Sequence, residues 1–181
     1  MLSPLISFGV IAITTIATMI ILCVMSTQRR LVVLDENVNN AMSQIGVQLS
    51  GRFDALTALL EITKGYALQE SETLIETVKS GRSDITAKST PADILRQEGI
   101  IRDALESFAR LTEQYPQLKT NENYIKTIDA VDIFENMLRT SRLIYNDSVT
   151  KLNREIRMLP VSMVAGMLGF SGRNYLEVKQ I

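Results

Sequence analysis

The sequence of 181 residues contains no histidine, no tryptophan, one cysteine and four prolines. Without histidine, it lacks the most versatile general base near neutral pH and the most common metal ligand. A single cysteine excludes an intramolecular disulfide and a cysteine-based zinc site. The 19 Lys and Arg are balanced by 20 Asp and Glu, so no excess of positive charge exists for binding nucleic acid. We therefore expect no metal, no cofactor and no nucleic-acid partner.

Charged residues are also absent from the first 28 positions, which contain a long apolar run from Leu5 to Met25. The only residues in it that are not apolar are small or carry a hydroxyl: Ser7, Gly9, Thr14, Thr15 and Thr18. As a helix the run is about 30 Å long, the thickness of a bilayer's hydrocarbon core. No basic residue precedes it, and it exceeds the apolar part of a signal peptide. The sequence therefore predicts an uncleaved transmembrane anchor over residues 1–28 rather than a cleaved signal peptide.

The charges that flank the run predict its orientation. Arg29 and Arg30 follow it directly, whereas no basic residue comes before it. Positive charge tends to stay on the cytoplasmic side of a membrane. We expect a single-pass protein with the N-terminus outside and the C-terminal domain in the cytoplasm.

Helical periodicity continues behind the anchor. Apolar residues recur every three or four positions, first over residues 31–49 and again over residues 53–78, and no segment alternates as a strand would. Gly51 and Asp54 lie between these two stripes. They mark either a kink in one long helix or a turn between two helices.

A polar stretch, Ser80–Pro91, predicts a loop. The next helix has a clear start, with Thr90 as N-cap, Pro91 at the first helical position and Asp93 in the first turn.

Two prolines then delimit the remaining elements. Pro116 ends the helix that starts at Pro91, and Thr120 or Asn121 caps a long final helix that continues to Pro160. The apolar segment Val161–Phe170 is too short to span a bilayer, so we expect it to close one end of the domain.

Three or four helices that each carry one apolar stripe bury those stripes most economically against one another. We predict an all-α fold with an antiparallel up-and-down helical bundle. The expected divisions are an anchor over residues 1–28, a bundle over residues 29–170 and a C-terminal tail over residues 171–181.

Polar residues interrupt the stripe of the final helix at seven-residue intervals. Glu135 and Arg142 lie between apolar stripe positions, Arg139 lies beside them, and Asn146 and Asn153 continue the series. Candidate partners on the first helices are Arg52, Asp54, Lys64 and Glu70. Because polar groups on a core face are costly unless they are paired, we expect a structural polar layer in which Glu135 pairs with an arginine. Two other interpretations stay open: a small anionic-ligand site, or a helical phase that leaves these groups in solvent.

Little else in the sequence supports catalysis. Without histidine, a serine activated by lysine is the remaining nucleophile, and no motif singles out a lysine for a hydrolase. The carboxylates lack the Glu-x-x-His spacing of di-iron bundles. We expect a protein that is not an enzyme.

Several strings spread over nearly the whole chain carry a family resemblance. In the N-terminal half they are Asp35, Val38, Ala41, Gln44, Gln48, Leu49, Arg52-Phe53-Asp54, Leu56, Leu59 and Lys64-Gly65-Tyr66-Ala67 with Glu70. In the C-terminal half they are Tyr115 to Asn121, Glu135, Arg139, Arg142, Tyr145-Asn146, Val149, Asn153, Pro160 and Gly169-Phe170. Together with the N-terminal apolar run, this set resembles the LemA family of bacterial membrane proteins. One departure is visible: the family usually carries a proline shortly after the aspartate equivalent to Asp54, where this chain has Ala55–Leu59.

The resemblance implies a helical bundle anchored in the bacterial cell membrane, without an established enzymatic activity and without catalytic residues. The family includes magnetosome-associated members. The resemblance also implies that the residues near Arg52, Asp54, Glu135 and Arg142 maintain architecture.

We accordingly expect a non-enzymatic structural or scaffold protein that organises the membrane through self-association. Gly9, Ala12 and Ala17 provide a small-residue face on which two spans can pack closely. The expected partners are membrane lipid, further copies of the chain and an unidentified protein. The alternative is a ligand-sensing or partner-recruiting bundle in which the Glu/Arg layer forms a polar pocket.

Overall fold

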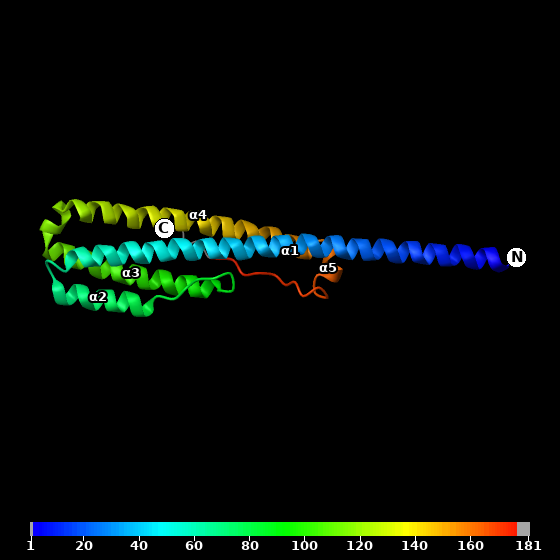
Figure 1. Ribbon diagram of the computed structural model, residues 1–181, viewed down its shortest axis with the longest axis horizontal. Coiled ribbons are helices and arrows are strands. Elements are labelled where there is room, and N and C mark those ends of the chain that lie inside the picture. The colour runs from blue at the N-terminus through cyan, green and yellow to red at the C-terminus, as the bar shows by residue number, and fades with distance from the viewer. Residues whose placement is uncertain (1, 177–181) are drawn as a thin grey trace. The chain divides into compact units, whose positions relative to one another are not determined.

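The computed structural model describes the backbone of residues 2–176 and the side chains of residues 7–176. Every regular element in this part of the chain is helical, which confirms the predicted all-α class (Figure 1). The elements are α1 (Leu2–Thr63), α2 (Leu68–Gly81), α3 (Pro91–Gln114), the short 3-10 helix η1 (Pro116–Thr120), α4 (Glu122–Arg157) and α5 (Val161–Val164).

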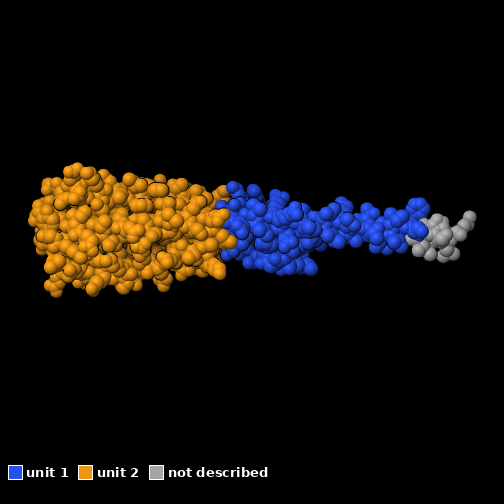
Figure 2. Space-filling model, viewed as in Figure 1, with its two compact units in different colours: residues 1–37, 148–173 blue, residues 38–147, 174–181 orange. Residues whose placement is uncertain are grey.

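The chain forms two compact units, coloured blue and orange in Figure 2. Unit 1 comprises the residues up to Asn37 together with Ser148–Arg173, and unit 2 comprises Val38–Asp147 together with the tail from Asn174. The helices α1 and α4 contribute residues to both. The sequence-based division into anchor, bundle and tail stays a prediction.

Gly51 and Asp54 do not separate two helices, because α1 continues without interruption to Thr63. No proline lies between Asp54 and Thr63, so every backbone N–H there remains available to the helix. Gly51 has a packing role instead: a Cβ atom at this position would collide with the ring of Phe134 on α4. The turn comes at residues 64–67, and the predicted second stripe is therefore divided between α1 and α2.

The apolar stripes of α1 to α4 form the core of unit 2, where consecutive helices run in opposite directions (Figure 1). Residues with at most 4% exposure in this core include Ile45, Leu49, Phe53, Leu56, Leu59, Leu60, Ile75, Val78, Ile94, Ile101, Phe108, Val131, Leu138 and Tyr145. Burying a side chain of this size contributes about 1.5–3 kcal/mol. The predicted stripes thus face the core, as the periodicity requires.

Both predicted helix starts have side-chain caps. Thr90 and Asp93 form a capping box, in which Asp93 Oδ2 accepts from the Thr90 N–H at 2.8 Å and Thr90 Oγ1 accepts from the Asp93 N–H at 3.3 Å. Asn121 Oδ1 accepts from the backbone N–H groups of Asn123 and Tyr124 and so caps α4. Of the two residues proposed from the sequence, Asn121 is the cap.

Unit 1 contains the N-terminal part of α1, the end of α4, α5 and the chain that follows α5. Its core includes Leu31, Val149, Leu152 and Ala165. The apolar segment Val161–Phe170 was expected to close one end of the domain, and its side chains are only partly buried in unit 1. Residues four apart lie on one side of a helical turn, so Val161 and Ala165 are buried whereas Met163 and Met167 are exposed.

Candidate functional site

Two ion pairs in unit 2 connect α4 with α1 and α3. Arg52 Nη2 on α1 donates to Glu135 Oε2 at 2.6 Å, and Arg142 Nη2 donates to Glu98 Oε2 on α3 at 2.6 Å. The side chains of Arg142 and Glu98 are both 17% exposed, and that of Arg52 is 10% exposed. Glu135 differs, since half of its side chain is exposed. We refer to these four residues as the charged cluster.

Within the charged cluster, burial has its main electrostatic effect on Glu98. It raises the pKa of Glu98, and the nearby carboxylate of Glu135 acts in the same direction. The guanidinium groups of Arg142 and Arg52 oppose this rise without cancelling it. Two arginines and two glutamates make the charged cluster electrically neutral when all four are ionised.

Several buried polar atoms in and beside the charged cluster have no hydrogen-bond partner among the described residues. The buried atoms without a partner are Gln48 Oε1, Arg52 Nε, Glu98 Oε1 and Arg142 Nε. Gln48 lies one helical turn before Arg52 on α1. These atoms comprise two donors and two acceptors, an arrangement suited to a small polar group rather than to a nucleophilic reaction.

Glu135 pairs with an arginine, as predicted, but the expectation that its charge is buried is wrong. The position flanks the core face of α4 instead of lying on it, which leaves one edge of the carboxylate in solvent. The partner of Arg142 was missed. Glu98 and Gln97 lie on α3 between the stripe residues Ile94 and Ile101, where the apolar spacing would place another apolar residue. These polar residues within an apolar stripe were the sequence feature that could have indicated a partner for Arg142.

Asp54 has a different partner. It pairs with Arg82 just after α2, where Arg82 Nη1 donates to Asp54 Oδ1 at 2.6 Å. Arg82 also donates to Ser50 Oγ, and its guanidinium lies 5.7 Å from the centre of the Phe53 ring. Asp54 therefore fixes the start of the loop to α1 and does not belong to the charged cluster.

The structure does not bring the remaining predicted residues into a layer. Glu70 and Arg139 are exposed, and neither has an ion-pair partner among residues 7–176. Lys64, in the turn after α1, pairs with Glu61 near the end of that helix at 2.8 Å. That the cluster maintains architecture stays a prediction.

The N-terminal part of α1 has the features that a bilayer requires. It is long and apolar enough to cross a membrane, and the side chains of its apolar stretch are not buried by the protein. Its threonines are satisfied internally: Thr14 and Thr15 donate to the carbonyl of Ile11, and Thr18 donates to that of Thr14, at 2.8–2.9 Å. Such bonds satisfy the hydroxyl where no water is present. The predicted span ends at Met25, while the side chain of its first residue, Leu5, lies outside the described residues.

Comparison with known proteins identifies the family. The model of the LemA family matches residues 41–181, which is most of the chain. The chain belongs to the LemA family. No curated protein matches the sequence. LemA is not known as a family of enzymes, and the residues described contain no group of three or more His, Cys, Asp or Glu that could hold a metal ion.

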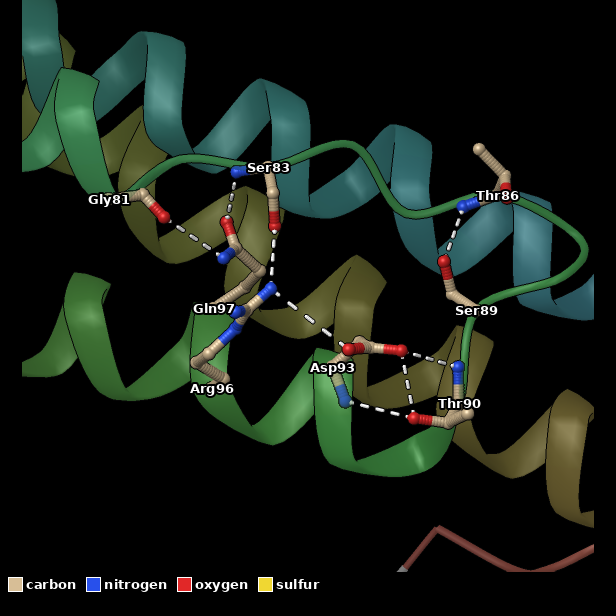
Figure 3. Close-up of polar contacts among 8 residues, drawn as sticks. All are labelled: Gly81, Ser83, Thr86, Ser89, Thr90, Asp93, Arg96 and Gln97. Atoms are coloured by element: carbon tan, nitrogen blue, oxygen red, sulfur yellow. Dashed lines mark hydrogen bonds and ion pairs between the residues drawn. The ribbon is translucent and has the colours of Figure 1, made fainter.

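The LemA chain holds its irregular segments with side-chain amides, which the sequence interpretation had largely overlooked. Fully buried Gln97 donates to the Gly81 carbonyl at 3.1 Å and accepts from the Ser83 N–H at 2.9 Å (Figure 3). Arg96, which precedes Gln97 on α3, donates from Nη2 to Ser83 Oγ at 3.2 Å (Figure 3). We call a side-chain amide that bonds in this two-point manner a carboxamide clamp.

Two further clamps in this LemA protein hold the C-terminal segment. In unit 1, Asn153 donates to the Arg173 carbonyl at 2.9 Å and accepts from the Arg173 N–H at 2.8 Å. In unit 2, Asn146 bonds to Leu176 in the same way, at 2.8 and 2.9 Å, and the Tyr145 hydroxyl donates to the Asn174 carbonyl. Asn146 was assigned to the polar layer from the sequence, but it binds backbone instead of charge.

Proposed function

We propose that the protein is a single-pass, membrane-anchored helical bundle that acts as a non-enzymatic structural or scaffold factor and organises the membrane. The observation that carries this proposal is the apolar stretch of α1, in which Phe8, Ile13 and Met19 are about 70% exposed. A soluble protein that displays so much contiguous apolar surface aggregates, whereas a bilayer accommodates it. The family gives no established reaction that the fold would have to support.

The flanking charges support one orientation for this anchor. Arg29 and Arg30 come directly after the apolar stretch, and no basic residue precedes it. By the positive-inside rule, the N-terminus is outside and the helical domain is in the cytoplasm of a bacterial cell.

Two surfaces support self-association. Gly9 and Ala12 give α1 a small-residue face within the apolar stretch, where close helix packing is favourable in lipid. On α4, a second apolar face is formed by Ile133, Met137 and Ile144, which are all exposed and lie within about 40° of one another around the helix. Copies of this chain are the partners that such faces fit, and an unidentified protein is the other partner we propose.

Membrane association is tested by expressing the full chain and washing the membrane fraction with alkaline carbonate. The proposal requires the protein to stay in the washed membranes. Recovery of most of the protein in the supernatant would refute the anchor.

Self-association is tested by crosslinking the full chain in membranes and by sizing it in detergent. The double variant Ile133→Lys, Met137→Lys should lower the crosslinked fraction several-fold. Gln114→Lys, Asn123→Lys is the matched control, because it adds the same positive charge at exposed positions elsewhere in unit 2. A native chain that is monomeric in both measurements would refute the scaffold mechanism while leaving the anchor intact.

The alternative is a ligand-sensing or partner-recruiting bundle with a polar Glu/Arg pocket. The four buried polar atoms without partners in and beside the charged cluster favour it. Small anions such as phosphate and acetate should then raise the melting temperature of the native chain, and Arg142→Gln should abolish the rise. No shift with any anion would leave the scaffold as the better account.

A further inference from the structure

The segment that follows α4 in unit 1 exposes a row of large apolar side chains. Leu159, Met163 and Met167 are 75%, 71% and 87% exposed, while Val161 and Ala165 are 7% and 1% exposed. Within α5 and the turns after it, the helical spacing of four places Met163 and Met167 on the side opposite Val161 and Ala165. The segment is therefore amphipathic, with one side packed in unit 1 and the other side unpacked.

Two ion pairs hold the ends of this segment close to α1 (Figure 1). Before it, Glu155 pairs with Arg30 at 2.9 Å, and after it, Arg173 pairs with Asp35 at 2.9 Å. Arg30 lies five residues beyond Met25, which corresponds to about 8 Å along a helix. The exposed row is consequently tied to the part of α1 that directly follows the apolar stretch.

Unit 1 also carries an excess of positive charge. Its six basic residues are Arg29, Arg30, Lys151, Arg154, Arg157 and Arg173, and its three acidic residues are Asp35, Glu36 and Glu155, so its net charge is +3. The whole chain has a net charge of -1, so this excess is specific to unit 1. Among the described residues, Arg29, Arg154 and Arg157 have no acidic partner within ion-pair distance. These cations are the complement of anionic lipid headgroups.

We propose that residues 158–170 form a second contact with the bilayer, at its interface. Leu159, Met163 and Met167 enter the boundary between headgroups and acyl chains, and the free arginines of unit 1 contact lipid phosphates. Thirteen residues are too few to cross the membrane as a helix, but a short amphipathic segment beside a basic surface is suited to lie in its interface. This inference rests on the proposed membrane anchor, because the anchor brings the segment to the depth of the headgroups.

The test uses the full chain with Cys23→Ala and one new cysteine, labelled with an environment-sensitive fluorophore. The reporting variants are Met163→Cys and Met167→Cys. Ile16→Cys in the apolar stretch reports the anchor, and Thr77→Cys, exposed on α2, is the control in unit 2. Each protein is reconstituted into phosphatidylcholine vesicles that contain phosphatidylglycerol, with a quencher attached near the headgroup end of the acyl chains.

We expect quenching at positions 163 and 167 to exceed that at position 77 by about twofold or more, as for a segment in the interface. Lowering the phosphatidylglycerol content should reduce this quenching, and Arg154→Gln, Arg157→Gln should reduce it in the same way.

The controls separate this inference from the anchor itself. One outcome would overturn the second contact and leave the anchor intact: the label at position 16 is quenched, but the labels at positions 163 and 167 are quenched no more than the label at position 77. No quenching at position 16 would refute the anchor and, with it, the basis of the inference. Shielding of positions 163 and 167 that disappears when the protein is diluted in the bilayer would mean that a second copy covers the segment, which would also overturn the lipid contact.

Discussion

The Arg52–Glu135 ion pair has one buried and one half-exposed partner, and this difference sets its contribution to stability. Removing Glu135 leaves Arg52, with only 10% of its side chain exposed, without a carboxylate. Because Glu135 is half exposed, solvent already screens the pair, so the full penalty of breaking a buried pair does not apply.

We predict that Glu135→Ala lowers the free energy of unfolding by about 1–2 kcal/mol, between the values for exposed and buried pairs. Thermal and chemical denaturation of the full chain in detergent measure the loss. Asp132→Ala is the matched control, since Asp132 is an exposed carboxylate one turn earlier on α4. Equal effects of the two substitutions would show that the ion pair contributes nothing specific.

Glu98 gives a prediction about pH. Burial raises the pKa of its carboxyl group above the ordinary value of 4.5. A carboxyl group whose pKa is higher in the folded chain binds its proton more tightly there. Its contribution to stability is therefore fully present below pH 4.5 and is lost as the pH rises through the folded-state pKa.

Replacing Glu98 by Gln removes this titration. We expect the stability of the native chain relative to Glu98→Gln to increase as the pH is lowered from neutrality toward 4.5, measured by denaturant unfolding at each pH. Glu106→Gln, on the same helix but exposed, controls for the loss of one carboxylate. A difference between native chain and Glu98→Gln that does not change with pH would contradict the burial argument.

At the scale of elements, the carboxamide clamps explain how a chain with few turn-forming residues holds its connections in place. Gln97 binds the loop after α2 at two backbone groups and is itself inaccessible to solvent. Removing it leaves the Ser83 N–H and the Gly81 carbonyl, which are partly buried, without their partner, and losing a hydrogen bond at such groups is costly.

We predict that Gln97→Ala costs about 1–3 kcal/mol and loosens the loop over residues 82–90. Amide hydrogen exchange should show lost protection at Ser83. Gln97→Glu keeps the acceptor for Ser83 but loses the donor to Gly81, so it should retain more protection at Ser83 than Gln97→Ala. Gln114→Ala, exposed at the end of α3, should leave exchange in the loop unchanged.

The C-terminal clamps allow a parallel prediction for the tail. Asn146→Ala should increase exchange at the Leu176 amide, and Asn153→Ala should do the same at Arg173, because each amide loses its acceptor. The site-specific response is the diagnostic feature. If either variant increased exchange equally at all core amides, the effect would reflect general destabilisation instead of loss of a clamp.

Elements with local signals could be predicted from the sequence, and contacts between distant segments could not. The start of α3 follows from Thr90, Pro91 and Asp93 alone, since a capping box is a contact within four residues. The role of Gly51 depends on Phe134, and that of Arg142 depends on Glu98, so both required the fold. The clamps were missed for the same reason, because an asparagine on a helix does not indicate which backbone it binds.

At the scale of the whole molecule, the N-terminal stretch of α1 is expected to determine where the protein resides. Among the described residues, none covers its exposed apolar side chains, and placing an arginine at the centre of such a span costs about 2.5–3.5 kcal/mol. Two arginines on one face of the span should therefore strongly disfavour the membrane-inserted form of the chain.

We predict that Ile13→Arg, Ile16→Arg transfers most of the protein from carbonate-washed membranes to the soluble or aggregated fraction. Thr77→Arg with Thr73→Arg adds the same charge on exposed positions of α2 and should leave the distribution unchanged. The helical content of the double variant, followed by circular dichroism, should remain high, because neither isoleucine packs in the core of either unit. Retention of the variant in washed membranes would show that contacts other than the apolar stretch hold the protein there, and the interfacial segment 158–170 would then be the first to test.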